Sequence, residues 1–363
     1  MKRIVIKIGS NVLTRADGTL DVTRLSALVD QMAALRRDGI DLVLVSSGAV
    51  AAGRGELRGR LDAGDLDQVS ARQLFSAVGQ AKLINRYYDL FREHAINCGQ
   101  VLATKENFER RRHYLNQQRC LDVMLANKVL PIVNENDTVS LSELMFTDND
   151  ELSGLIAGMT GADRLIILSN IDGLYTGDPS DPSSRLVKRV PADADIDTFI
   201  SSSRSSAGRG GMGSKCRVAR RVASEGIEVI VANGRRENIL TDLIAGADVP
   251  HTVFEAAPKP ASALKKWIAH SDSFAKGTLA VNDGAAEALR RGGNSLLPVG
   301  VVAVDGDFDA DDIVTVTCGG AIVAWGKSAV DAATAQSLAG RSGQKPVIHA
   351  DYLYIDEQAF ARD

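Results

Sequence analysis

The sequence lacks any apolar run long enough to cross a lipid bilayer. Its longest runs, such as LVLV and RLIIL, have the length of a strand, whereas a membrane-spanning helix needs about 20 apolar residues. The strand-like run RIVIKI follows directly after the first two residues, which leaves no room for the charged, apolar and small-residue regions of a signal peptide. We therefore expect a cytoplasmic protein with no membrane partner.

Cysteine is scarce, and charge of one sign is not in excess. The chain has 4 Cys among 363 residues, with no CxxC pair and no His-rich cluster, so we expect reduced thiols and neither a disulfide framework nor a zinc site. Its 42 Lys and Arg face 46 Asp and Glu, a formal net charge of −4. Such a chain has no overall attraction to nucleic acid or to anionic membranes. Any anion site must therefore be local.

The order of the predicted elements indicates an α/β domain. Short β-rich runs alternate with helical patterns, which predicts a three-layer αβα sandwich with a mainly parallel central sheet. One helical pattern extends from Val22 to Leu35, and Gly39 is well placed to end it. Strands are expected over residues 3–8, 41–45, 99–103, 129–133, 164–168 and 228–232.

The last part of the chain has a different pattern. Three prolines interrupt the alternation of strands and helices, so we expect a linker over 256–275 between domains at 1–255 and 276–363. Two domains also suit the length, since one core stops growing near about 250–300 residues. The second domain should be small and β-rich, a curled sheet or partial barrel with one helix, 285–290. Its strands are expected over 279–281, 296–304, 313–316 and 322–325.

Two motifs follow the first two predicted strands. VIKIGSNV places Lys7 near the end of a strand and Gly9 in the next turn, where backbone N–H groups can approach phosphate oxygens. Alternatively, Lys7 only extends its aliphatic stem along an edge strand. LVLVSSGAVAAG ends its strand with Ser46 and Ser47 before a small-residue helix, whose N-terminus can bind a carboxylate or phosphate. Alternatively, Ser is a plain helix cap.

Two acidic segments, VNENDTV and FTDNDEL, concentrate acceptors and donors at two strand or loop ends. Such acceptors suit an α-amino group, and a carboxylate can also orient catalytic lysines or hydrated magnesium. Alternatively, DNDEL is a helix cap with acidic first-turn residues. The polar residues of the two segments are Asn134, Glu135, Asn136, Asp137, Asp148, Asn149 and Asp150.

Two further motifs suit a nucleotide. LIILSNIDGLYTGDP ends its strand with Ser169 and Asn170, which could contact a base and a ribose, although a surface turn would look similar. SAGRGGMGSK can wrap a polyphosphate with its N–H groups and place Lys215 on the transferred group, although a flexible linker is the alternative. It departs from a Walker A loop, because Ser214 precedes Lys215. Together, the lysines, glycines and carboxylates favour phosphoryl transfer.

In this order, VIKIGSN, LVLVSSGA, NENDTV, TDNDELSGLIA, SNIDGLYTGDP and GGMGSK resemble the amino-acid kinase superfamily. The segments SSGAVAAGR, QLFSAVGQ, VNEND and TDNDELS are most similar to its members that phosphorylate the side-chain carboxylate of L-glutamate. The segment GTLAVNDGAAEALRRGGNSLLPVGVVAVDGDF resembles a PUA domain. The resemblance covers nearly the whole chain.

The resemblance implies a role for each matching residue. Lys7 and Lys215 would contact the ATP phosphates, and Asp150 would orient both lysines, while Mg²⁺ would bind mainly through the phosphates. The implied substrate-binding residues are Ser47, Asp137 and Asn149. The implied nucleotide-binding residues are Lys7, Ser169, Asn170, Arg209, Gly210, Gly211, Met212, Gly213, Ser214 and Lys215. Asn170 stands where the family commonly has Asp, and Arg209 where it commonly has Thr.

The implied reaction converts L-glutamate and ATP to L-glutamate 5-phosphate and ADP, the first step of proline biosynthesis. The implied partners are proline as feedback inhibitor, a second copy of the chain in a dimer or tetramer, and glutamate-5-phosphate reductase. Aspartate and N-acetylglutamate are the alternative acceptors. We do not expect RNA binding by the C-terminal domain, because its acidic residues are not outweighed by basic ones and aromatic residues are few.

Overall fold

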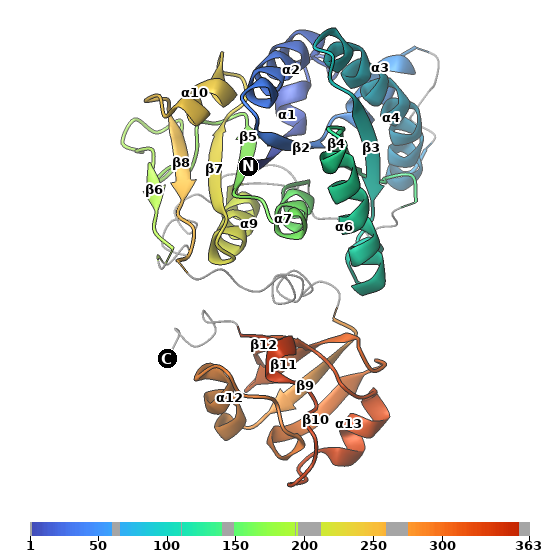
Figure 1. Cartoon of the computed structure of the whole chain (residues 1–363), viewed down its shortest axis with the longest axis vertical. Coiled ribbons are helices and arrows are strands. Elements are labelled where there is room, and N and C mark those ends of the chain that lie inside the picture. Colours follow the sequence, from blue (N-terminus) through green and yellow to red (C-terminus); the bar gives the residue numbers. More distant parts are fainter. Residues whose placement is uncertain are drawn as a thin grey trace. The chain divides into compact units, whose positions relative to one another are not determined.

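The computed structural model describes residues 2–59, 66–109, 111–139, 149–192, 194, 212–258 and 275–355. The chain divides into two compact units, Met1–Asn107 with Leu115–Pro260, and Phe108–Tyr114 with Ala261–Asp363 (Figure 1). Most of the expected linker, 256–275, lies outside the described residues. Within the described ranges, no helix has both the length and the apolar character that a membrane span requires.

An eight-stranded sheet forms the centre of the larger unit, in the order β3-β4-β2-β1-β5-β7-β8-β6. The strands from β3 to β7 in this order run parallel, which confirms the predicted mainly parallel sheet. Each lies within two residues of its predicted bounds: β1 (Arg3–Ile8), β2 (Asp41–Ser46), β3 (Cys98–Ala103), β4 (Leu130–Glu135), β5 (Arg164–Ser169) and β7 (Glu228–Asn233).

Two strands at one edge of this sheet were not predicted. β8 (His251–Phe254) runs antiparallel to β7, and β6 (Arg189–Val190) pairs with β8 in parallel. β6 has only two residues, too few for a periodic signal. β8 has four residues and follows Pro250 directly, so its short apolar run resembles the start of the proline-rich linker.

Helices cover both faces of the sheet (Figure 1). On one face, α2, α4 and α10 contribute buried side chains to the core that contains Ile4, Ile6 and Ile8 of β1. Helices α7 and α9 lie on the other face. The helices of this part are α1 (Ser10–Leu13), α2 (Val22–Arg37), α3 (Ala49–Glu56), α4 (Gln68–Glu93), α5 (Glu106–Glu109), α6 (Arg111–Ala126), α7 (Asn149–Thr160), α9 (Met212–Ser224) and α10 (Ile239–Ala245).

Helix α2 forms where its spacing predicts. Asp21 caps its first turn by accepting a hydrogen bond from the backbone N–H of Arg24 at 3.1 Å. Leu25, Val29 and Met32 are buried on its inner face. The helix ends before Gly39, whose φ of +81° is one that residues with a side chain rarely adopt.

The small residues of α3 allow it to pack closely against α4. A Cβ atom added to Gly53 would lie 1.8 Å from the carbonyl oxygen of Phe75, and one added to Gly79 would lie 1.7 Å from that of Ala49. The two backbones are therefore in direct contact. Helix packing therefore explains both glycines. The same contact fixes the position of α3, the helix that follows β2 in the chain.

The smaller unit is a five-stranded sheet in the order β10-β9-β11-β12-β13, with mixed strand directions and its own apolar core. The prediction of one helix was wrong, since α13 is present as well as α12. The predicted strand over 296–304 begins only at Val301, because Pro298 opens a 3₁₀ turn, Pro298–Gly300. The elements are β9 (Gly277–Val281), α12 (Asp283–Arg290), β10 (Val301–Gly306), β11 (Ile313–Cys318), β12 (Ala321–Lys327), α13 (Ala332–Leu338) and β13 (Leu353–Ile355).

We expect Gly53→Ala to lower the free energy of unfolding by about 1–3 kcal/mol, because the new methyl group forces α3 and α4 apart. Gly55→Ala, two residues along the same helix, is the matched control. Its Cβ would meet nothing closer than Thr19 Cγ2 at 3.6 Å, so it should be neutral or stabilise the chain by up to about 1 kcal/mol. Urea unfolding of the three proteins measures both effects, and equal stabilities would contradict the packing argument.

Candidate active site

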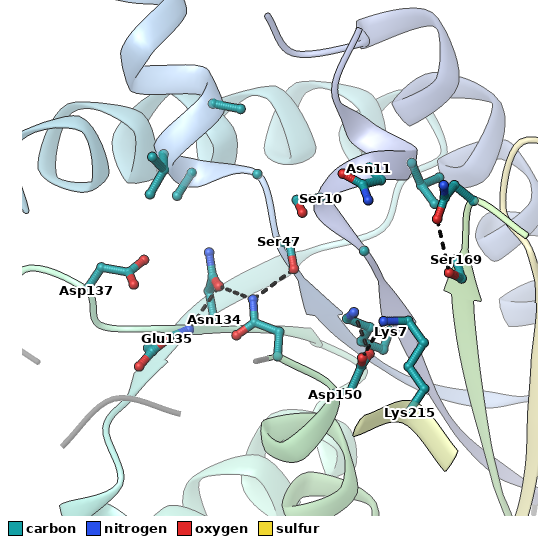
Figure 2. Close-up of a pocket in the computed structure, with 18 of the residues that line it drawn as sticks. Lys7, Ser10, Asn11, Ser47, Asn134, Glu135, Asp137, Asp150, Ser169 and Lys215 are labelled. Atoms are coloured by element: carbon teal, nitrogen blue, oxygen red, sulfur yellow. Dashed lines mark hydrogen bonds and ion pairs between the residues drawn. The ribbon is translucent and has the colours of Figure 1, made fainter. Parts of the chain in front are cut away.

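The predicted motifs meet at the carboxyl ends of the parallel strands. β1 lies between β2 and β5. The chain runs from β1 toward β2, β3 and β4 on one side, and then crosses from β4 to β5 on the other side of β1. In open parallel sheets, ligands bind at this kind of switch point. A cavity of about 610 Å³ opens there (Figure 2). It is lined by residues at or just after the ends of β1, β2, β4 and β5, by the first turns of α7 and α9, and by Arg72 of α4.

A buried carboxylate lies between two lysines at one end of this cavity. The Nζ atom of Lys7 is 2.5 Å from Oδ1 of Asp150, and Nζ of Lys215 is 2.9 Å from Oδ2 (Figure 2). Asp150 is 0% exposed and Lys7 only 4%. Burial alone would raise the pKa of the Asp150 carboxyl, but the two ammonium groups outweigh it and hold this pKa below its ordinary value. In the part of the chain that the structure describes, one anion and two cations give this end a net charge of +1.

One of the alternatives for these residues is wrong, and the other is confirmed in part. Lys7 belongs to a central strand with neighbours on both sides, so it does not lie along a sheet edge. Asp150 does lie in the first turn of α7, but its carboxylate pairs with lysines from β1 and α9.

The turn at Gly9 passes close to Lys7 and to β5. A Cβ atom added to Gly9 would lie 3.1 Å from the carbonyl oxygen of Leu168 and 3.5 Å from Lys7 Nζ.

An amide connects the ends of β2 and β4 in the middle of the cavity. The Nδ2 group of Asn149 donates to Ser47 Oγ at 2.9 Å, to Asn134 Oδ1 at 3.1 Å and to the carbonyl oxygen of Ser46 at 3.2 Å (Figure 2). Ser47 is not the helix cap, because Gly48 occupies that position with a φ of +103°. The Oδ1 atom of Asn149 is buried and accepts no hydrogen bond from the described residues. It is therefore an acceptor that a ligand can use.

An acidic group forms the other end. Asp137 and Glu135, 7% and 3% exposed, share the guanidinium group of Arg72 from α4. Arg72 donates to Asp137 Oδ1 from Nε at 2.9 Å and from Nη2 at 2.6 Å, and Nη2 is 3.3 Å from Glu135 Oε2. The hydroxyl of Ser76 donates to Asp137 Oδ2 at 3.2 Å. Among the described residues, two carboxylates and one guanidinium give this end a net charge of −1.

The sequence reasoning missed Arg72 as a site residue. It lies in the first turns of α4, a long helix with many exposed charges, and its segment precedes the QLFSAVGQ motif. Gln80 was also missed. Its side chain donates to the carbonyl oxygen of Glu135 at 3.1 Å and accepts from Asn134 at 3.3 Å, so it fixes the end of β4.

The loop after β5 forms one side of the cavity with Ser169, Asn170 and Ile171. Ser169 Oγ donates to Asn170 Oδ1 at 3.4 Å. Asp172 follows two residues after Asn170. Its carboxylate accepts hydrogen bonds from Nε and Nη2 of Arg236, each at 2.8 Å. The backbone N–H of Leu174 donates to Thr252 Oγ1 at 2.8 Å. The loop is thus tied to the segment after β7 and to β8.

The glycine-rich segment is described only in part. Arg209, Gly210 and Gly211, and also Asp148 of the acidic segment, lie outside the described residues. Helix α9 begins at Met212, so its first turn also contains Gly213, Ser214 and Lys215. Met212 and Lys215 line the cavity.

The arrangement suits phosphoryl transfer between two anions. The lysine end can neutralise phosphate oxygens, and the rigid strand ends can hold two ligands in line. Such a reaction needs little covalent chemistry from the protein, and positioning and charge account for most of the catalysis.

Comparison with known proteins agrees with this chemistry. Residues 2–233 match the amino acid kinase family, and residues 277–349 match the PUA domain. The chain is 57% identical over 357 residues to glutamate 5-kinase of Bacteroides thetaiotaomicron, covering 98% of both chains. It is 43% identical to glutamate 5-kinase of Chlorobaculum tepidum, covering 98% of this chain and 97% of that one. Carbamate kinase from Giardia lamblia bound to AMP-PNP has a similar fold, with a TM-score of 0.53 at 18% identity, covering 70% of this chain and 99% of that one.

We expect Asp172→Asn to lower the free energy of unfolding at neutral pH but not in acid. The hydrogen bonds from Arg236 outweigh burial and lower the pKa of Asp172. The ionised carboxylate therefore stabilises the folded chain above about pH 4, the ordinary value, and this contribution is lost as the pH falls through the lowered pKa. The loss at neutral pH should be at most about 1 kcal/mol, because the pair is partly exposed to solvent.

Urea unfolding of both proteins at several pH values between about 3 and 7 measures this difference. A difference that stays constant over the whole range would show that Asp172 stabilises the loop through its shape and not through its charge.

Proposed function

This chain belongs to the amino acid kinase family and, within it, to the glutamate 5-kinases, and we propose that the cavity of the larger unit is its active site. The reaction transfers the γ-phosphoryl group of ATP to the side-chain carboxylate of L-glutamate, the first step of proline biosynthesis. The observation that supports this location is the opposite charge of the two ends of one cavity. The anionic end suits the α-ammonium group of glutamate, and the cationic end suits the reacting carboxylate and the ATP phosphates.

In this proposal, an oxygen of the side-chain carboxylate attacks the γ-phosphorus in line, and ADP leaves. No general base is needed, because a glutamate side chain with a pKa near about 4.3 is already ionised at neutral pH. Lys7 and Lys215 stabilise the charge on the transferring phosphoryl group. Asp150 positions both ammonium groups, since each of its two oxygens holds one of them.

The substrate-binding residues lie between the two ends. Asp137 and Oδ1 of Asn149 accept hydrogen bonds from the α-ammonium group, the donor that glutamate carries at neutral pH, while the hydroxyl of Ser47 contacts the rest of the substrate. The buried Oδ1 of Asn149, which has no partner among the described residues, provides an acceptor for the substrate. Its Nδ2 is already held by the ends of β2 and β4.

The nucleotide lies on the side of β5 and α9. Ser169 and Asn170 contact the base and ribose, and the segment from Arg209 through Gly213 and Ser214 to Lys215 surrounds the phosphates. Mg²⁺ is bound mainly by phosphate oxygens, since it prefers hard oxygen ligands and commonly binds through the phosphates of its substrate.

Three further partners follow from the same proposal. Proline acts as a feedback inhibitor, the chain forms a dimer or tetramer, and a glutamate-5-phosphate reductase takes up the product. An acyl phosphate is a reactive carboxyl derivative that water can hydrolyse, so rapid transfer to a second enzyme protects it.

A coupled assay for ADP tests the acceptor. We expect L-glutamate to give the highest kcat/KM, with aspartate and N-acetylglutamate much poorer, because only glutamate has both the free ammonium group and the required chain length. Hydroxylamine should convert the product to a hydroxamate, which identifies an acyl phosphate. A higher kcat/KM for either competitor would overturn the proposed acceptor.

We expect Lys215→Met to lower kcat by about 10²-fold or more, since it removes a cation that stabilises the transition state. Lys82→Met is the control, because Lys82 is an exposed lysine of α4 that pairs only with Glu56 in the described structure. Steady-state kinetics with saturating ATP measure both variants. Near-normal turnover by Lys215→Met would remove this lysine from the catalytic residues.

A further inference from the structure

Arg72 is the one cation lining the described part of the cavity that phosphoryl transfer does not use. The other cationic side chains there are Lys7 and Lys215, and both are bound to Asp150. Arg72 lies at the opposite end, beside Asp137. Its position indicates a function in binding the part of the substrate that carries the α-ammonium and α-carboxylate groups.

The guanidinium group of Arg72 has donors to spare. Nε and Nη2 donate to Asp137 and Glu135, whereas Nη1 donates to no residue in the described ranges. Arginine carries five N–H donors in a planar fork, and its fork matches a carboxylate. The side chain remains 31% exposed although both of its carboxylate partners are buried. Arg72 can therefore donate to a further anion while it keeps its hydrogen bonds to Asp137 and Glu135.

The substrate supplies an anion at this end. An α-amino acid carries its ammonium group and its α-carboxylate on one carbon, so their partners on the protein must be neighbours. Asp137 and Arg72 are such neighbours, at 2.6 Å from oxygen to nitrogen. Without Arg72, the α-carboxylate would face Asp137 and Glu135, both buried carboxylates, and like charges repel.

We propose that Arg72 binds the α-carboxylate of the substrate while Asp137 binds its ammonium group. This inference rests on the proposed function and makes Arg72 a residue that determines specificity. It selects α-amino acids over compounds that have the ammonium group and the reacting carboxylate but no α-carboxylate. The compound that tests this selection is 4-aminobutyrate, which is glutamate without its α-carboxylate.

The test compares kcat/KM for L-glutamate with kcat/KM for 4-aminobutyrate. Where turnover of 4-aminobutyrate is too slow to measure, its inhibition constant takes the place of kcat/KM. In Arg72→Gln we expect kcat/KM for glutamate to fall about 10- to 100-fold, as for the loss of a charged hydrogen bond. The value for 4-aminobutyrate should change less than about 3-fold, because the ammonium site remains anionic. The preference for glutamate then largely disappears.

Two variants complete the test. Arg72→Lys keeps the positive charge but not the fork, so it should restore part of the preference; it also serves if Arg72→Gln does not fold. Arg86→Gln removes an exposed arginine from the same helix and should leave the preference unchanged.

An equal loss for both substrates in the Arg72 variants would show that Arg72 only neutralises Asp137 and Glu135, and would overturn this inference alone. Failure of the unaltered enzyme to phosphorylate glutamate would overturn the proposed function instead. The two failures are therefore distinguishable.

Discussion

The ion triad of Lys7, Asp150 and Lys215 is the interaction on which the active site depends. It joins the central strand β1 to the first turns of α7 and α9, which are far apart in the sequence. A buried carboxylate without a partner would be strongly destabilising. Two ammonium groups outweigh that cost, and they also leave a net positive charge for phosphate oxygens. The same contact thus keeps Asp150 ionised and prepares the cavity for anions.

The topology of the sheet places the triad. Because β1 lies between β2 and β5, the strand ends that carry Lys7, Ser47 and Ser169 are neighbours, although more than a hundred residues separate the first from the last. The contact of α3 with α4 then fixes the helix that carries Arg72 against the end of β2. The cavity is the consequence of strand order and helix packing together.

Much of this fold could be predicted from the sequence, because the strands of the parallel sheet are buried and appear as continuous apolar runs. β6 and β8 were missed, since two and four residues give no periodicity. The motifs that follow the strands indicated the two lysines and their carboxylate, because a parallel sheet brings its strand ends to one edge. The small-residue helix was harder to interpret. Its N-terminus suggested an anion site, whereas the structure shows that Gly53 serves the contact with α4.

Arg72 could not be predicted, because its function depends on tertiary contacts. An arginine in the first turns of a long helix resembles a solvated charge, and only the fold places it beside Asp137 and Glu135. These contacts also make the two ends of the cavity differ in charge. With net charge +1 at the lysines and −1 at the carboxylates, a substrate that carries an ammonium group at one end and a carboxylate at the other has one favourable orientation. That orientation directs the side-chain carboxylate, and not the α-carboxylate, toward the γ-phosphoryl group.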